Sequence, residues 1–497
     1  MYSLTREQFA AIAREGNIIP VYREIFADME TPVSAFLKMG DSKYSYLLES
    51  VEGGEKWGRY TFLGGEPSII FRYTDKTVTI TENGAERSFP AEGDPLDELR
   101  RLMKKYRPAQ VKGLPRFYGG AVGFLTYDSV RYFEKMPESV QDDLHVPDAL
   151  FTVTDTILIF DNIAHTIKVV SNAYVGNGSA SAAYDRACAK IDAIIERLKK
   201  PLPPVEPVMG QPSKVEFKSL FDRAVYENSV ERCKHYIREG DIFQVVLAQR
   251  LEAELNVPPF QVYRALRAVN PSPYMYYLNC GDVKIVGASP ESLVRVEDGI
   301  VETRPLAGTR PRGKDEQEDL QLERSLLDDE KERAEHIMLV DLGRNDIGRV
   351  SKGGSVKVDE LMEVERYSHV MHIVSNVKGT IREDMDAYDA LRATFPAGTL
   401  SGAPKIRAME IIEEMEGKRR GIYGGCVGYF SFSGNMDMAI AIRTLYIDGS
   451  KAYLGVGAGI VADSSPASEY QETINKGKAL IKAVKVAENG LDPLRES

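Results

Sequence analysis

Cysteine is scarce in this sequence, and its spacing excludes two common kinds of structure. The four cysteines among 497 residues are Cys188, Cys233, Cys280 and Cys426, and no two of them form a Cys-x-x-Cys pair. Scattered cysteines are typical of a reducing cytosol and provide neither a disulfide framework nor a zinc site. We therefore expect a cytoplasmic protein.

Long apolar segments are also missing. No run of about 18 apolar residues, the length that a membrane-spanning helix needs, occurs in the chain. Residues 1–7 lack the apolar core of a secretory signal, which again favours a cytoplasmic location. With 43% hydrophobic residues, the chain can bury a large core and form one large domain or two ordinary ones.

The chain also lacks an excess of positive charge. The chain has 63 lysines and arginines against 74 aspartates and glutamates, a formal net charge of −11. An acidic chain is a poor general binder of nucleic acids or acidic membranes. Any anionic ligand must therefore find positive charge locally.

A proline-rich segment interrupts the chain near its middle. Four prolines occur within the seven residues 201–207, and a fifth follows at Pro212. Such a segment cannot be a regular helix or a central strand. We predict a stiff linker or surface crossing that divides the chain near residue 210.

Residue patterns on both sides of this segment predict an α+β protein with large, mostly antiparallel sheets. The predicted strands are 68–73, 77–81, 152–160, 274–278, 284–288, 424–432, 438–446 and 451–456. The predicted helices are 94–106, 183–199, 218–239, 259–268, 317–341, 385–393 and 405–415.

Two acidic pairs in the C-terminal half suggest a site for a divalent cation. Glu332 and Glu335, like Glu469 and Glu472, are three residues apart, so each pair lies on one face of a helix. If two such helices meet, four carboxylates converge, and an all-oxygen set suits Mg²⁺. The alternative is a solvated helix face on which Glu472 pairs with Lys476.

The second acidic pair follows a glycine-containing strand. Ser465 and Pro466 predict a helix start, as N-cap and first-turn proline. Upstream, an apolar segment contains Gly455, Gly457 and Gly459. Glycine lets the backbone approach a ligand, and N–H groups beside a helix N-terminus can bind a carboxylate. The alternative is a strand whose glycines mark bulges or tight packing.

Six ordered segments resemble the chorismate-utilising enzymes, and most closely the large synthase subunits of anthranilate synthases. They are IFQVVLAQR (242–250), NPSPYM (270–275), GASPE (287–291), RPLAGT (304–309), LVDLGRND (339–346) and PAGTLSGAPK (396–405). The resemblance is dense over residues 215–490. In the N-terminal half of the chain the resemblance is thinner and rests on YLLES (46–50) and YGGAVG (118–123).

The resemblance implies a fold and a reaction. The fold has two large, mostly antiparallel sheets packed together with helices outside. An N-terminal domain, residues 1–205, would carry a regulatory tryptophan site and partner contacts, and residues 206–497 would form the chorismate-binding catalytic domain. The reaction is the Mg²⁺-dependent conversion of chorismate and ammonia to anthranilate and pyruvate, the first step of tryptophan biosynthesis. A partner glutamine amidotransferase subunit supplies the ammonia, in a heterotetramer of two copies of each, and tryptophan inhibits.

The resemblance also implies the ligand-binding residues. Mg²⁺ would bridge the ring carboxylate of chorismate to Glu335 and Glu472, with Glu332 and Glu469 close behind. The other carboxylate would be held by Tyr423, Arg443 and the backbone N–H groups around Gly457, Ala458 and Gly459. A solvated surface position is the alternative for Arg443, but the apolar segment 438–445 around it argues against that.

Four residues have implied catalytic or supporting roles. Glu291 matches the general acid that protonates the departing C4 hydroxyl, a role for which burial must raise its pKa. His372 matches a histidine that assists the loss of pyruvate, although a single histidine in an apolar segment is usually a core residue. Thr399 and Lys476 match neighbours of the ligand and the metal.

Two positions select among related reactions. Water-using isochorismate and salicylate synthases resemble one another in having a lysine that activates water, where this chain has Gln244, which is no base at neutral pH. Aminodeoxychorismate synthases have a nucleophilic lysine where this chain has Ala307. We therefore expect anthranilate. The rivals are aminodeoxychorismate synthesis and a non-catalytic amino-acid sensor on the same fold.

Two further motifs imitate other catalytic sites. Residues 308–314 imitate a phosphate-binding loop, but Asp315 replaces the required Ser or Thr, so we predict a mobile polar loop. Residues 424–428, with Cys426, imitate the nucleophile elbow of a glutamine amidotransferase. No histidine follows His372 in the chain to complete that site, so we expect no glutaminase activity and a separate amidotransferase partner.

Two segments resemble the site that binds inhibitory tryptophan between the halves of the chain. As local structure they are only a strand end and a proline-bounded turn. Their residues are Leu48, Glu49, Ser50, Pro271, Ser272, Tyr274 and Met275.

Overall fold

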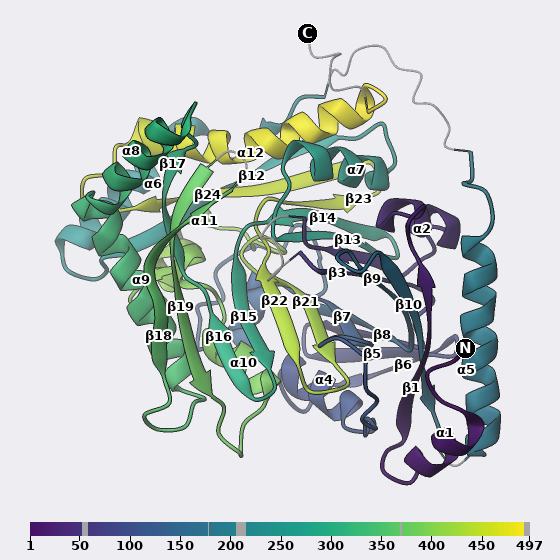
Figure 1. Cartoon of the computed structure of the whole chain (residues 1–497). Coiled ribbons are helices and arrows are strands. Elements are labelled where there is room, and N and C mark those ends of the chain that lie inside the picture. The colour runs from purple at the N-terminus through teal and green to yellow at the C-terminus, as the bar shows by residue number, and fades with distance from the viewer. Residues whose placement is uncertain (52–57, 177, 205–214, 368–369, 492–497) are drawn as a thin grey trace.

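Two large antiparallel sheets form the centre of the molecule, and helices cover their outer faces (Figure 1). The computed structural model describes residues 1–51, 58–176, 178–204, 215–367 and 370–491. Within these ranges the strands form two sheets of 12 strands each. The predicted α+β fold with two large, mostly antiparallel sheets is confirmed.

The first sheet combines strands from the two ends of the sequence. Across the sheet they are β1 (Ile18–Phe26), β10 (Thr166–Tyr174), β9 (Thr156–Asp161), β3 (Tyr60–Gly64), β2 (Ser45–Glu49), β13 (Tyr274–Cys280), β14 (Val283–Ser289), β23 (Thr444–Asp448), β24 (Lys451–Ile460), β12 (Gln244–Glu254) and β11 (Lys218–Ser219), with β20 (Gly402–Ala403) paired to β12.

The second sheet also combines strands from both halves of the chain. Its strands in order are β17 (Leu306–Pro311), β19 (Val370–Thr380), β16 (Ile300–Thr303), β15 (Ser292–Glu297), β22 (Met436–Ile440), β21 (Cys426–Ser431), β7 (Gly120–Leu125), β8 (Ala149–Thr154), β4 (Ile69–Thr74), β5 (Thr77–Glu82) and β6 (Ala85–Pro90), with β18 (Lys357–Arg366) paired to β19.

The helices connect and cover these strands. The α-helices are α1 (Arg6–Ile12), α2 (Pro32–Met39), α4 (Pro95–Met103), α5 (Ala180–Leu198), α6 (Arg223–Arg238), α7 (Pro259–Val269), α8 (Glu316–Leu327), α9 (Glu330–Gly348), α10 (Ala387–Thr394), α11 (Lys405–Glu416) and α12 (Pro466–Glu488). Two 3₁₀ turns are η1 (Tyr127–Tyr132) and η2 (Gly398–Leu400). Within the described ranges, no helix is both long and apolar enough to span a membrane.

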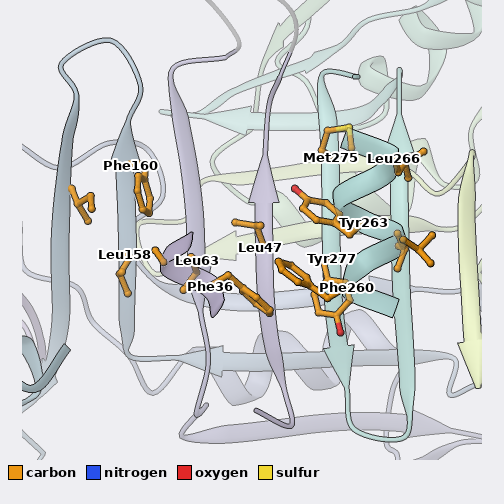
Figure 2. Close-up of a cluster of buried hydrophobic side chains, with 14 of the residues drawn as sticks. Phe36, Leu47, Leu63, Leu158, Phe160, Phe260, Tyr263, Leu266, Met275 and Tyr277 are labelled. Atoms are coloured by element: carbon orange, nitrogen blue, oxygen red, sulfur yellow. The ribbon is translucent and has the colours of Figure 1, made fainter. Parts of the chain in front are cut away.

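Alternation along the strands builds one core between the sheets and another beneath the helices. Successive side chains of a strand point to opposite faces. In β13, Tyr276 packs into the core shared with the second sheet, whereas Met275 and Tyr277 face the helices. Figure 2 shows Tyr277 beside Phe36 of α2 and Phe260 of α7, with ring centroids 5.4 and 5.1 Å away.

The two halves of the chain share both sheets. β2 pairs with β13 in the first sheet, and β7 pairs with β21 in the second. The predicted boundary between residues 205 and 206 lies at the proline-rich segment, and residues 205–214 are outside the described part. The division into two domains stays a prediction, while both halves contribute to one pair of sheets.

Three segments that were each predicted as a single strand or helix form two elements in the structure. Segment 152–160 divides into β8 and β9, and segment 438–446 into β22 and β23, in both cases between different sheets. Strands buried on both faces are apolar throughout, so their sequence hides the crossing. Helix 317–341 divides into α8 and α9, because the Asp329 carboxylate accepts hydrogen bonds from two N–H groups of a new first turn.

Two smaller predictions also need correction. The segment 308–314 is not a mobile loop, since residues up to Pro311 belong to β17 and pair with β19. Beyond the strand, Arg312 pairs with Asp319 at 2.8 Å, which fastens the segment to α8. Helix α12 starts at Pro466 as predicted, but the Ser465 side chain makes no capping hydrogen bond.

Candidate active site

A cavity of about 540 Å³ lies where two segments cross from one sheet to the other. Glu291 stands between β14 of the first sheet and β15 of the second, and Arg443 stands between β22 and β23. Arg443 has φ +48°, a left-handed conformation suited to a sharp change of direction. The prediction of a continuous strand around Arg443 was wrong, because the residue lies at a crossing.

This cavity brings together all but one of the predicted catalytic, substrate and metal residues. Its walls include Glu291, His372, Thr399, Lys476, Tyr423, Arg443, Gly457, Gly459, Glu332, Glu335, Glu469 and Glu472. Ala458 is the exception and does not line the cavity. It is fully buried in β24 and paired with Leu247 of β12, so the predicted contact of Ala458 with substrate is not supported.

Glu291 has the properties of a proton donor at neutral pH. Its side chain is 8% exposed, and its Oε1 accepts a hydrogen bond of 3.1 Å from the Thr399 hydroxyl. Burial raises the pKa of Glu291 to about 7, while the Thr399 hydroxyl and the Arg443 charge oppose that rise. At pH 7 a large share of the carboxyl therefore carries its proton.

Arg443 provides positive charge without a protein partner. Among the described residues, its guanidinium makes no hydrogen bond or ion pair, although it lines the cavity. Burial lowers the pKa of Arg443, partly offset by the charge of Glu291. A desolvated guanidinium favours an anion that can accept two parallel hydrogen bonds, such as a carboxylate.

The backbone of β24 adds donors to the same wall. The Gly457 carbonyl accepts a 2.9 Å hydrogen bond from Lys476 Nζ, so this carbonyl points away from β12. In an antiparallel ladder the N–H and C=O of one residue point the same way, and residues two apart repeat that direction. The N–H groups of Gly457 and Gly459 therefore point away from β12.

The same glycines also make room for two side chains. A Cβ atom on Gly455 would lie 2.3 Å from the Tyr423 ring, and one on Gly457 would lie 2.5 Å from the Tyr423 hydroxyl. A Cβ atom on Gly459 would lie 2.7 Å from Gln244 Nε2. The sequence left two interpretations of these glycines open, tight packing or a backbone that approaches a ligand. In the structure the same glycines pack tightly against side chains and line the cavity.

The acidic pairs of α9 and α12 line the same cavity. Burial and then repulsion from Glu332 raise the pKa of Glu335. Burial also raises the pKa of Glu469, with a further contribution from Glu472 and an opposing hydrogen bond from Ser464. These carboxylates are therefore held in surroundings that favour neutralisation of their charge by a proton or a cation.

Nearby cations engage one member of each pair. Lys476 Nζ lies 2.8 Å from Glu472 Oε1, and Arg310 Nη1 lies 3.5 Å from Glu332 Oε1. Within the described ranges, no three acidic, histidine or cysteine side chains are close enough to form a metal cage. Mg²⁺ usually keeps several waters and takes only one or two carboxylates beside substrate oxygens. The donor chemistry of this wall fits that mode of binding.

His372 is held as a neutral base. Its Nδ1 lies 2.9 Å from the Gly308 carbonyl oxygen and 3.1 Å from the Thr309 hydroxyl. The carbonyl can only accept, so Nδ1 carries the proton and Nε2 keeps its lone pair. Burial lowers the pKa of His372, which keeps the ring neutral at pH 7.

Sequence reasoning missed several residues around the cavity. Lys331 lines it, and Arg310 contacts Glu332 as described above. Arg420 and Glu416 form a buried pair behind Tyr423, with side chains 3% and 8% exposed. The run Lys418-Arg419-Arg420 has the composition of a solvated turn, and no signal in the sequence distinguishes its buried member.

A second, smaller cavity contains most of the residues predicted to bind tryptophan. Leu48, Glu49, Ser50, Tyr274 and Met275 line it. Pro271 and Ser272 are not among its lining residues, and Ser272 is buried. The Glu49 carboxylate is already engaged by Arg267 through two hydrogen bonds of 2.7 Å.

Cys426 is not an accessible nucleophile. It is fully buried within β21, between β22 and β7. Burial raises the pKa of its thiol to about 12. A reactive cysteine needs an accessible thiolate, so the resemblance of this segment to a nucleophile elbow carries no catalysis.

Comparisons with known proteins identify the family of this chain. The profile of chorismate binding enzymes matches residues 46–482. Anthranilate synthase component 1 of Acetivibrio thermocellus is 50% identical over 493 residues, covering 98% of this chain and 99% of the relative. Its counterpart in Aquifex aeolicus is 49% identical over 488 residues, covering 98% of each chain.

Solved structures place the fold in the same group. The crystal structure of anthranilate synthase component I from Streptococcus pneumoniae matches with a TM-score of 0.76 and 40% identity, over 92% of this chain and 98% of that one. The Escherichia coli isochorismate synthase MenF shares the fold, with a TM-score of 0.69 at 18% identity, over 97% of this chain and 100% of that one. The chain therefore belongs to the chorismate-binding enzyme family, among the component 1 subunits of anthranilate synthase.

Proposed function

We propose that this chain converts chorismate and ammonia to anthranilate, pyruvate and water in an Mg²⁺-dependent reaction. The observation that carries the proposal is the composition of one cavity. A buried carboxyl with a pKa of about 7, Glu291, lies in the same walls as two acidic pairs and the guanidinium of Arg443, which has no hydrogen-bond partner in the described part of the chain. This combination suits a substrate with two carboxylates and a hydroxyl leaving group.

The two carboxylates of chorismate would occupy opposite walls. Arg443 and the N–H groups of Gly457 and Gly459 would receive one carboxylate, since they offer positive charge and hydrogen-bond donors on the same wall. The ring carboxylate would face Glu335 and Glu472, with Glu332 and Glu469 behind them. Bound Mg²⁺ would neutralise negative charge that opposes addition to the ring.

Proton transfers are assigned to two side chains. Glu291 would donate its proton to the C4 hydroxyl as ammonia adds at C2 and water leaves. The Thr399 hydroxyl orients the Glu291 carboxyl for this donation. His372 Nε2 would then accept the C2 proton as the C3–O bond breaks and the ring becomes aromatic, and would return it to the departing enolpyruvyl group, which leaves as pyruvate. Lys476 supports the wall by bonding both Glu472 and the Gly457 carbonyl.

Two cavity residues favour anthranilate over related products. Gln244 lines the cavity and donates a 3.4 Å hydrogen bond to Glu335, and an amide cannot activate water as a base. Ala307 lines the cavity as well and has no nucleophile for a covalent adduct. Ammonia needs no base of this kind, so the amine would remain at C2.

The direct test is turnover by the purified chain. With chorismate, Mg²⁺ and an ammonium salt at about pH 7, where a large share of Glu291 is protonated, we expect a fluorescent product that co-elutes with anthranilate, together with one equivalent of pyruvate. Chelation of the metal should stop the reaction. Glutamine in place of ammonium should give no product, since Cys426 is inaccessible.

Other outcomes of this assay would redirect the assignment. Accumulation of isochorismate or of 4-amino-4-deoxychorismate would refute the arguments from Gln244 and Ala307. Tryptophan binding with no turnover under any condition would favour a non-catalytic sensor.

A separate glutamine amidotransferase subunit is part of the proposal. The relatives are named as component 1, which implies a second component, and the buried Cys426 leaves this chain without an accessible thiol of its own at that motif. A heterotetramer of two copies of each subunit is the expected assembly. The cytoplasmic location stays a prediction from composition.

Feedback inhibition by tryptophan is assigned to the second cavity. Its walls come from β2 and β13 of the first sheet and β21 and β22 of the second. Tyr274 donates a 3.0 Å hydrogen bond to Asp437 there, and it pairs across the β13–β14 hairpin with Ser289. Ser289 lies two residues before Glu291, which supports a short structural connection between this cavity and the catalytic carboxyl.

Ser50→Phe is expected to relieve tryptophan inhibition without loss of catalysis. A phenyl group would overfill the second cavity, and overfilling a packed site costs about 1–3 kcal/mol, so the inhibitory concentration should rise about tenfold or more. Inhibition curves for anthranilate formation provide the measurement. Ser88→Phe, on the exposed strand β6, is the control and should be inhibited normally. Undiminished inhibition of Ser50→Phe would refute the site.

A further inference from the structure

Arg420 is a buried cation that binds several parts of the active-site wall at once. Its side chain is 3% exposed. Nη1 donates to the Leu400 carbonyl at 2.6 Å, and Nη2 donates to the Val246 carbonyl at 2.8 Å. Nε and Nη2 also bind the Glu416 carboxylate, at 2.8 and 2.5 Å. One planar group thereby links β12, η2 and the end of α11.

Two aromatic rings flank the same guanidinium. The guanidinium carbon lies 4.5 Å from the ring centroid of Tyr127 and 5.6 Å from that of Tyr423. Tyr423 also packs against Gly455 and Gly457 of β24. Both β24 and Arg420 therefore contact the Tyr423 ring.

Arg420 itself does not line the cavity, but the residues that it holds do. Leu400, Val246 and Tyr423 are all part of the cavity wall. Leu400 directly follows Thr399, whose hydroxyl bonds to Glu291. The guanidinium thus contacts the Tyr423 ring directly and, through Leu400, lies one residue away from the hydrogen bond that orients the general acid.

A stabilising role alone explains this arrangement poorly. A buried ion pair is weak evidence for stability, because the cost of desolvating both charges offsets their attraction. A rigid planar group with several donors supplies fixed geometry, and lysine lacks that geometry. We propose that Arg420 is a positioning residue, which fixes Tyr423 and the Thr399–Leu400 segment for the reaction. This inference rests on the proposed function.

The test compares two lysine substitutions on adjacent residues. Arg420→Lys keeps the charge but loses the planar set of donors, and we expect the KM for chorismate to rise, and kcat to fall, by about tenfold to a hundredfold. Arg419→Lys is the matched control. Arg419 pairs with Asp142 at 3.1 Å and is partly exposed, so this variant should behave like the unmodified chain.

A double-mutant cycle distinguishes positioning from a general loss of stability. Tyr423→Phe alone is expected to raise the KM. If Arg420 acts through Tyr423, adding Tyr423→Phe to Arg420→Lys should raise KM by clearly less than it does in the unmodified chain. Fully multiplicative effects would overturn the inference, as would equal behaviour of the two lysine variants. Thermal unfolding of every variant is measured in parallel.

The experiment also distinguishes a variant that fails to fold and a failure of the proposed function from a failure of the positioning role. If Arg420→Lys does not fold, Glu416→Gln carries the same cycle, since it keeps the side-chain size and weakens the hold on the guanidinium. An unmodified chain that makes no anthranilate would refute the proposed function instead. Normal turnover of the unmodified chain with normal turnover of Arg420→Lys would refute only the positioning role.

Discussion

Glu335→Gln is expected to abolish turnover while leaving the fold intact. The substitution removes one negative charge from the acidic wall and preserves side-chain size. Catalysis that depends on a bound cation should lose several kcal/mol of charge stabilisation, so kcat/KM should fall by about a thousandfold or more. Anthranilate formation across a range of Mg²⁺ concentrations is the measurement.

Stability should respond to this substitution in the opposite sense. Burial and the charge of Glu332 already raise the pKa of Glu335, so ionisation of this carboxyl destabilises the folded chain. A neutral amide removes that destabilisation, and the midpoint of thermal unfolding without metal should not decrease. Glu330→Gln, on the exposed side of the first turn of α9, is the matched control and should retain activity. Full turnover of Glu335→Gln would refute the metal assignment.

Glu291→Gln is expected to lower kcat by about a hundredfold to ten-thousandfold, the usual contribution of a general acid. Glu291 must be protonated to donate, and its pKa is about 7. At a fixed concentration of free ammonia, the activity of the unmodified chain should therefore decline as the pH rises through that value. The pH profile of kcat/KM should lose this decline in Glu291→Gln.

Thr399→Val provides a second measurement on the same group. The Thr399 hydroxyl lowers the pKa of Glu291 by bonding the ionised form, so its removal should move the decline to higher pH. A decline that stays at the same pH in both variants would belong to another group and would contradict the assignment of Glu291.

The raised pKa of Glu291 also predicts the direction of a pH effect on stability. Between the ordinary carboxyl value of 4.5 and about 7, the folded chain binds more protons at this group than the unfolded chain does. The contribution of Glu291 to the free energy of unfolding should therefore fall as the pH rises through that window. Glu291→Gln should remove this part of the slope in urea unfolding measured from pH 4.5 to 8.

The sequence was informative where chemistry is local. The spacing of each acidic pair predicted one helix face, and Pro466 predicted the start of α12, because helix geometry and capping depend on a few neighbouring residues. The strand with Gly455, Gly457 and Gly459 was also visible as a pattern. Family resemblance then related these local features to one reaction.

Only the tertiary structure decided what surrounds them. The apolar segment 438–446 reads as one strand, yet it leaves the second sheet and enters the first at Arg443, and that crossing opens the cavity. Arg420 looks like its partly exposed neighbour Arg419 in sequence, but it is buried where it binds Glu416 and the carbonyls of Leu400 and Val246. Side-chain spacing along a chain is local, whereas burial and the choice of sheet also depend on partners far away in sequence, such as Val246 for Arg420 and β14 for β23.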